Sequence, residues 1–188
     1  NFSPQKKTKM LVTIKKGKHL SNQLPWLDLG LFNNGQIVAE VMFHSTCRYI
    51  LKEGEQEDWN KLNGRSWGIW PLIKSYMMHW NSDRWAWRYN PKTDKIELSP
   101  YFYIEGVRFY AESLGIEPGI LNLNQKYRII IKPFYKSVLY IIEQMDGKVL
   151  WRYEAKHKAG SKIGFLAPGY FGGTETADHD IDYIYKRL

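Results

Sequence analysis

Side chains able to bind or act on a sugar are concentrated in residues 66–89. This segment holds five of the eight tryptophans of the chain, together with His79, Asp83, Arg84 and Arg88. An arginine guanidinium can hold a carboxylate or sulfate group through two parallel hydrogen bonds, and an indole ring offers a flat face to a sugar. His79 could act as an acid or base whose pKa is tuned by Asp83, or it could be a hydrogen-bonded core residue. The segment therefore predicts a binding site for an acidic carbohydrate.

In the second half of this segment, arginines and tryptophans occupy alternating positions. In a strand, Arg84 and Arg88 point to one face, while Trp85 and Trp87 point to the other. The structural interpretation buries the two tryptophans in the core and leaves the arginines in water. The functional interpretation makes the arginine face one wall of a concave sheet. The sugar platforms expected beside that wall are Trp67, Trp70 and Trp80.

Further candidate residues lie near the C-terminus. Residues 168–173 are rich in glycine around Tyr170, which fits a loop at the rim of a β-scaffold, where such scaffolds often carry their sites. Three alternating carboxylates could offer oxygens to a calcium ion, but we expect them to face solvent, so neither a metal nor a cofactor is predicted. These carboxylates are Asp178, Asp180 and Asp182. The sequence has no G-x-S-x-G, P-loop, Rossmann or H-E-x-x-H motif, so those reaction classes are not expected.

Alternation of period two recurs along the chain and predicts a β-rich fold. Strands are expected at residues 10–14, 35–43, 66–70, 76–80, 84–89, 95–104, 107–110, 161–166 and 180–186, with three more between 126 and 155. Asp146-Gly147 predicts a hairpin turn, because that turn needs positive φ. Helix is expected only in short pieces such as residues 57–62. The pattern predicts a single domain over residues 1–188, an all-β antiparallel sandwich of two sheets.

The composition is basic, with 27 Lys and Arg against 19 Asp and Glu and a formal net charge of +8. Six lysines fall within residues 6–18, where they either solvate the chain or attract a polyanion. Because the other basic residues are scattered and no basic helix is predicted, nucleic acid is not the expected partner. The single Cys47 excludes an internal disulfide and an ordinary cysteine zinc site.

The expected location is extracytoplasmic, meaning secreted, periplasmic or at the cell surface. No apolar run is long enough to span a bilayer. The chain begins at Asn1, which fits the removal of a secretory signal and equally fits a shortened chain.

The order of strands and turns in the C-terminal half carries a family resemblance. The strands at residues 127–131, 138–142 and 181–184, with the Asp146-Gly147 turn before the last, resemble the concanavalin A-like lectin and glucanase sandwiches. The resemblance implies a jelly-roll sandwich. Polysaccharide lyases of that superfamily carry a late Tyr in a Tyr-x-Lys-Ala-Gly segment, to which Tyr170 could correspond. Tyr170 is followed by Phe-Gly-Gly instead, and the Gln-x-His, Arg-x-Glu-Leu-Arg and Glu-x-Asp-x-x-Glu strands are absent, so neither the lyase nor the glucanase mechanism is carried over.

These observations predict a secreted or cell-surface glycan-binding sandwich that prefers acidic carbohydrate, such as an anionic polysaccharide. The predicted ligand-binding residues are Trp67, Trp70, Trp80, Arg84 and Arg88. The alternative is a polysaccharide lyase, before a glycoside hydrolase, with His79 as base, Tyr170 as acid and an arginine neutralising a uronate carboxylate. A third hypothesis is a sandwich that binds protein or nucleic acid through its basic N-terminal segment.

Overall fold

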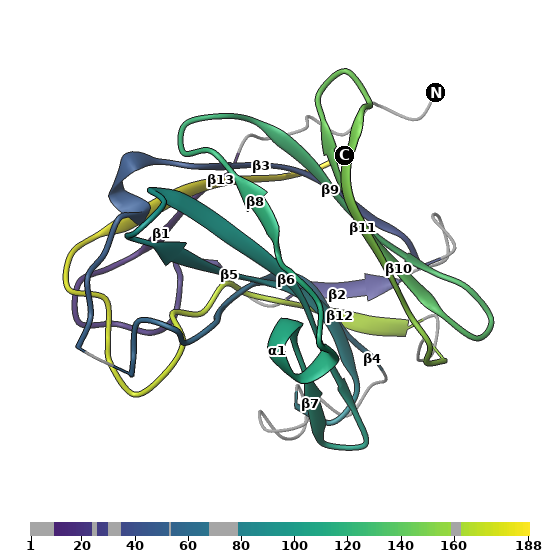
Figure 1. The fold of residues 1–188 in the computed structure, drawn as a ribbon. Coiled ribbons are helices and arrows are strands. Elements are labelled where there is room, and N and C mark those ends of the chain that lie inside the picture. The colour runs from purple at the N-terminus through teal and green to yellow at the C-terminus, as the bar shows by residue number, and fades with distance from the viewer. Residues whose placement is uncertain (1–9, 24–25, 30–34, 53, 68–78, 159–162) are drawn as a thin grey trace, which may run out of the picture.

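The computed structural model describes residues 10–23, 26–29, 35–52, 54–67, 79–158 and 163–188. Their regular structure is nearly all β-strand, in two antiparallel sheets that enclose a common core (Figure 1). Sheet A runs in the order β1 (Met10–Ile14), β13 (Ile181–Arg187), β3 (Ile37–Phe43), β9 (Tyr127–Pro133), β10 (Val138–Gln144) and β11 (Val149–Ala155). Sheet B runs in the order β2 (Trp26–Leu29), β12 (Ile163–Ala167), β4 (Asn60–Trp67), β5 (Ser82–Asn90), β6 (Lys95–Ile104) and β7 (Val107–Phe109), and β8 (Gly119–Leu121) also pairs with β6. The predicted antiparallel β-sandwich is confirmed.

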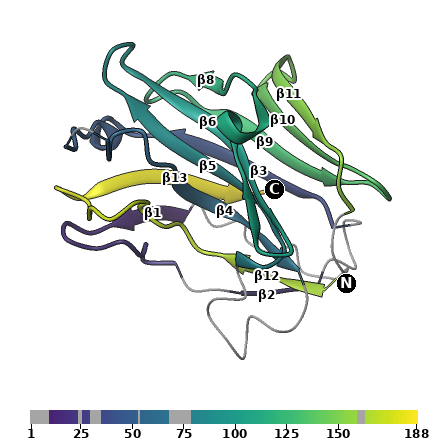
Figure 2. The ribbon, with the colours of Figure 1, turned by 60° about the horizontal axis from the view of Figure 1, so that its bottom comes forward.

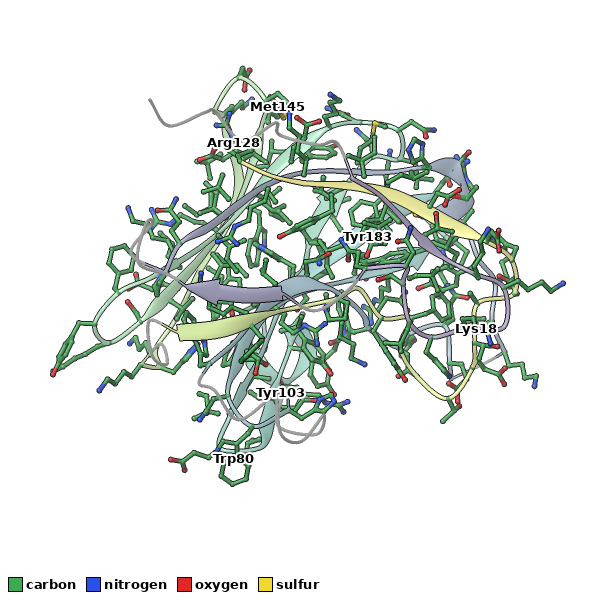
Figure 3. All side chains as sticks on the ribbon, turned by 180° about the vertical axis from the view of Figure 1, so that it is seen from behind. Lys18, Trp80, Tyr103, Arg128, Met145 and Tyr183 are labelled. Carbon is green, nitrogen blue, oxygen red and sulfur yellow. The ribbon has the colours of Figure 1, made fainter. Side chains whose placement is uncertain are left out.

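The core lies between the two sheets and is rich in aromatic rings. On β5, Trp85 and Trp87 are 1% and 0% exposed, as predicted. Trp87 packs against Phe43 of sheet A, with 5.1 Å between the ring centres. Tyr183 of β13 also lies in the core, near the middle of the molecule in Figure 3. Because these β5 tryptophans point inward, the alternate side chains of β5 point out of the sandwich.

Tight turns join consecutive strands where glycine supplies positive φ. Gly147, with φ of 93°, forms the predicted hairpin turn between β10 and β11. Glu105 and Gly106, with φ of 49° and 83°, connect β6 to β7. The short helix α1 (Ala111–Leu114) follows β7 and ends at Gly115, whose left-handed conformation closes the helix.

The predicted helix at residues 57–62 is wrong, because the second half of this segment belongs to a sheet. Asn60 and Lys61 open β4 and pair with Trp87 and Ala86 of β5. Long-range pairing overrides the local helical pattern here. The strands predicted at residues 66–70 and 76–80 lie mostly outside the described residues; Ser66 and Trp67 end β4, and residues 79 and 80 form a turn before β5.

The alternating carboxylates near the C-terminus have separate partners. Asp180 forms a 2.6 Å ion pair with Lys15, and Asp178 lies 2.6 Å from His179. Within the described ranges, no group of three or more His, Cys, Asp or Glu side chains is arranged to hold a metal ion. None of the helices in the same ranges is long and apolar enough to cross a membrane.

Candidate functional site

A groove of about 440 Å³ is formed by outward-pointing residues of sheet B and by the loops around α1. Figure 2 shows β4, β5 and β6 next to one another, and α1 contacts β6. The charged and aromatic lining is Glu57, Asp58, Trp59 and Lys61 before and at the start of β4, Arg88 and Tyr101 on β5 and β6, and Arg108, Tyr110 and Glu112 on β7 and around α1. The outer face of sheet B is therefore the face that offers a binding surface.

Lys61 is the cation at the centre of this surface. Its backbone forms an isolated antiparallel bridge with Tyr170, with N–O distances of 2.7 and 2.8 Å. Its Nζ atom lies 5.5 Å from the ring centre of Tyr101 and 5.1 Å from that of Tyr170. Burial, reinforced by the positive charges of Arg84 and Arg108, lowers the pKa of Lys61 to about 8.

Arg84 is buried beside Lys61 and is only 4% exposed. Its guanidinium donates to the carbonyl oxygens of Leu62 and Pro168, at 3.4 and 2.7 Å. The side chain crosses Gly64 of β4, where a Cβ atom would collide with it. Burial lowers the pKa of Arg84 to about 10, which still leaves it charged at neutral pH.

Arg108 completes the group of cations, which we call the cationic cluster: Lys61, Arg84 and Arg108. Its guanidinium lies 5.0 Å from the ring centre of Tyr110 and interacts with the hydroxyl of Tyr101. Among the described residues, no member of the cationic cluster forms an ion pair with a carboxylate. In the described part of the chain, Asp58 is the one carboxylate whose charge acts on Lys61. The three positive charges of the cationic cluster therefore exceed the negative charge beside them, which favours an anionic ligand.

Arg88 lines the same groove but has its charge compensated. It forms ion pairs with Glu97 at 2.6 Å and Glu112 at 2.7 Å. Its guanidinium covers the ring of Trp59 at 4.3 Å, and the Trp59 indole donates to Glu112 at 2.8 Å. Arg88 and Trp59 therefore line the groove with polar groups that are already bound within the protein.

A carboxyl pair borders the groove near Gly173. Thr174 donates to Glu55 through its hydroxyl at 2.8 Å, and its hydrogen bonds lower the pKa of Glu55. Burial, together with the charge of Glu55, raises the pKa of Asp58. The pKa values of Glu55 and Asp58 are thus shifted in opposite directions.

His79 and Tyr170 each interact with Lys61 of the cationic cluster, His79 through charge and Tyr170 through its ring. The His79 ring meets the Tyr103 ring edge-on, with 5.1 Å between the centres, and the Tyr103 hydroxyl lies 3.4 Å from that of Tyr101. Partial burial and then the charges of the cationic cluster lower the pKa of His79. Tyr170 stacks on His19 with 5.2 Å between the ring centres. Lys61 is thus the cation with which both residues interact.

The predicted tryptophan platforms lie elsewhere. Trp67 donates its indole N–H to Asp83, which also accepts from Tyr140 and binds His157, so Trp67 joins a network on the inward face. Trp80 is 52% exposed and projects at the edge of the molecule near Tyr103 (Figure 3). Neither lines the groove. Trp70 is outside the described residues.

Several groove residues were missed by the sequence reasoning. They are Trp59, Lys61, Tyr101, Arg108 and Tyr110. The only sequence signal for any of them is the alternation of Tyr101 and Tyr103 with core residues along β6. Lys61 and Arg108 carry no motif and meet only through long-range strand pairing.

Comparisons with known proteins support the fold. No protein-family model matches the sequence, and a search of curated proteins finds no match. The alginate lyase from Klebsiella pneumoniae is similar in structure, with a TM-score of 0.52 and 12% identity over 80% of this chain; the chain spans 56% of that enzyme. The likeness extends to the fold alone.

Two carbohydrate-binding modules are more distant neighbours. The CBM2 module of the evolved Dit protein from Lactobacillus casei BL23 phage J-1 has a TM-score of 0.41 and 11% identity, over 96% of this chain and 70% of that one. The CBM66 module from Bacillus subtilis has a TM-score of 0.37 and 9% identity, over 88% of this chain and 75% of that one.

Proposed function

We propose that this chain is a glycan-binding sandwich of the concanavalin A-like type whose ligand is an acidic polysaccharide, bound in the groove on sheet B. The observation that carries the proposal is the cationic cluster, which gathers three positive charges, none of them in an ion pair within the described residues, beside tyrosine rings. A carboxylate or sulfate group would supply the missing negative charge. Hydrogen bonds to charged groups contribute about 1.5–3 kcal/mol each, which is enough to select anionic over neutral sugars.

Tyrosines rather than tryptophans would contact the sugar rings. Tyr110 and Tyr170 are partly exposed beside the cations, and such rings bury the apolar face of a sugar while their hydroxyls reach its polar groups. The alginate lyase with a similar fold is named for a polysaccharide of uronic acids, the class of ligand that this groove fits. An extracytoplasmic location, where such polysaccharides occur, belongs to the same proposal.

A glycan array with heparin, alginate and pectin fragments, followed by calorimetry on the best ligand, tests this function. Arg108→Gln should weaken binding about tenfold or more, whereas the matched change Arg152→Gln, at an exposed position on β11 of sheet A, should leave affinity unchanged. Equal retention on heparin and on any DNA would favour the nucleic-acid hypothesis instead. Absence of binding to every carbohydrate would overturn the proposal.

A second candidate function is cleavage of the same polysaccharide by a lyase reaction. It is favoured by the interaction of both His79 and Tyr170 with Lys61 of the cationic cluster. A base would remove the proton next to the uronate carboxylate, an acid would protonate the departing glycosidic oxygen, and the cations would stabilise the charge on the carboxylate. An increase in ultraviolet absorbance from the new C=C bond, lost in both His79→Asn and Tyr170→Phe, would establish this activity; no absorbance change with any bound polysaccharide would exclude it.

A further inference from the structure

We propose that Lys61 and Arg108, which both line the groove, form one anion subsite to which the buried Arg84 adds its charge, and that at alkaline pH a carboxylate or sulfate group binds there together with one proton, which Lys61 takes up. The inference rests on the proposed function and specifies where in the groove the anionic group lies and how its binding responds to pH. No covalent change is involved, and the proton comes from solvent.

The geometry of Lys61 leaves its amine available to a ligand. The backbone bridge to Tyr170 fixes the start of the side chain, and the rings of Tyr101 and Tyr170 flank its end. Among the described residues, no hydrogen bond or ion pair involving Nζ is found. Cation–π contacts contribute about 0.5–2 kcal/mol, less than a full hydrogen-bonded shell would. The amine is therefore held in place without a hydrogen-bond acceptor among the described residues.

The charges around Lys61 are unbalanced in favour of cations. The groups that face it from the neighbouring elements are Asp58 before β4, Arg84 on β5, Tyr101 on β6, Arg108 on β7, and Tyr170 on the segment after β12. Arg84 and Arg108 both disfavour a charge on Lys61, and only Asp58 opposes them. An entering anion reverses this balance, because it cancels the repulsion among the three cations.

The expected consequence is a pH dependence with a defined sign. In the empty groove the pKa of Lys61 is about 8, and a bound anion raises it. Affinity is then greatest below pH 8 and falls by up to tenfold for each pH unit above it, until the raised pKa is reached. The pKa of Arg84 is about 10, so Arg84 retains its charge over most of this range and some affinity remains. His79, whose pKa is lowered, and Asp58, a carboxyl, titrate on the acidic side.

Calorimetry with oligogalacturonate and heparin fragments between pH 6.5 and 9.5, at constant ionic strength, tests the inference. Titrations at pH 8.5 in two buffers of different ionisation enthalpy count the protons taken up. We expect uptake of most of one proton and about a fivefold loss of affinity from pH 8 to 9 in the natural chain. Lys61→Arg, whose charge is permanent, should bind with no such dependence, and Lys61→Gln should bind weakly at every pH. A flat profile in the natural chain, or the same slope in Lys61→Arg, would overturn it.

A second measurement separates failure of this inference from failure of the proposed function. Lysines dimethylated with ¹³C give separate NMR signals, and the Lys61 signal is assigned by its loss in Lys61→Arg. Sulfate at high concentration should raise the titration midpoint of this signal and of few others. If no polysaccharide binds but sulfate produces this shift, the proposed function fails and the subsite stands. If sulfate leaves the midpoint unchanged, the subsite is refuted.

Discussion

The guanidinium of Arg88 lies 4.3 Å from the ring centre of Trp59, and both side chains bind the carboxylate of Glu112. The pair borders the groove, yet the Arg88 guanidinium and the Trp59 N–H already bind carboxylates of the protein. Arg88 and Arg108 line the same surface and should therefore respond differently to the same substitution.

Arg88→Gln should lower the free energy of unfolding by about 1–3 kcal/mol, because it leaves the largely buried Glu97 without its ion pair. Arg108→Gln should change stability by less than about 0.5 kcal/mol, since it breaks no ion pair in the described residues. Urea denaturation of both variants measures the difference. Equal losses of stability would show that the two arginines do not differ in role.

Trp85→Ala and Trp87→Ala should each lower the free energy of unfolding by about 3–5 kcal/mol, because they empty a packed core. Trp80→Ala removes a ring that is 52% exposed and should lower it by less than about 1 kcal/mol. Thermal melts of the three variants provide the comparison. A similar fall in melting temperature for all three would contradict the assignment of Trp80 to the surface.

Lys61→Met should stabilise the ligand-free protein by about 1–3 kcal/mol at pH 7, while it weakens anion binding. The lowered pKa of Lys61 means that its charged form is disfavoured in the folded state, so the unfolded state binds more protons between pH 8 and 10.5. The advantage of the variant should be full below pH 8 and disappear as the pH approaches 10.5. Urea denaturation at pH 7 and pH 10.5 tests this sign; a less stable Lys61→Met at pH 7 would contradict it.

Gly64→Ala should destabilise the fold by about 1–3 kcal/mol, because the added Cβ would overlap the carbonyl oxygen of Asp83 and the backbone of Arg84. Ser82→Ala is a suitable control on the adjacent strand, since its buried hydroxyl has no hydrogen-bond partner. Chemical denaturation should show a loss only for the glycine variant. A loss of the same size in both would mean that this strand pair is generally intolerant of change.

The features that the sequence predicted correctly depend on local pattern. Alternation located β5 with its buried Trp85 and Trp87, and the Asp146-Gly147 pair located the turn between β10 and β11. Such signals need only neighbouring residues, because the period of a strand and the φ of a turn are local properties.

The composition of the groove could not be predicted in the same way. Lys61 meets Tyr170 across more than one hundred residues of chain, and a helical interpretation of residues 57–62 hid the strand that brings them together. Arg84 was selected for its type, but nothing local showed that it would be buried against carbonyl groups instead of facing solvent. Strand register, which decides both, is a non-local property.

The backbone around Tyr170 is packed so closely that it has little room to move. A Cβ on Gly169 would overlap the hydroxyl of Tyr183, and one on Gly172 would overlap the carbonyl oxygen of Trp59, while Phe171 between them is fully buried. Tyr170 is thus anchored on both sides by close packing, and the segment that leads to the groove residues Gly173 and Thr174 is held in place before any ligand arrives. A ligand that fits it loses less conformational entropy on binding, so selectivity here should come from shape as well as charge.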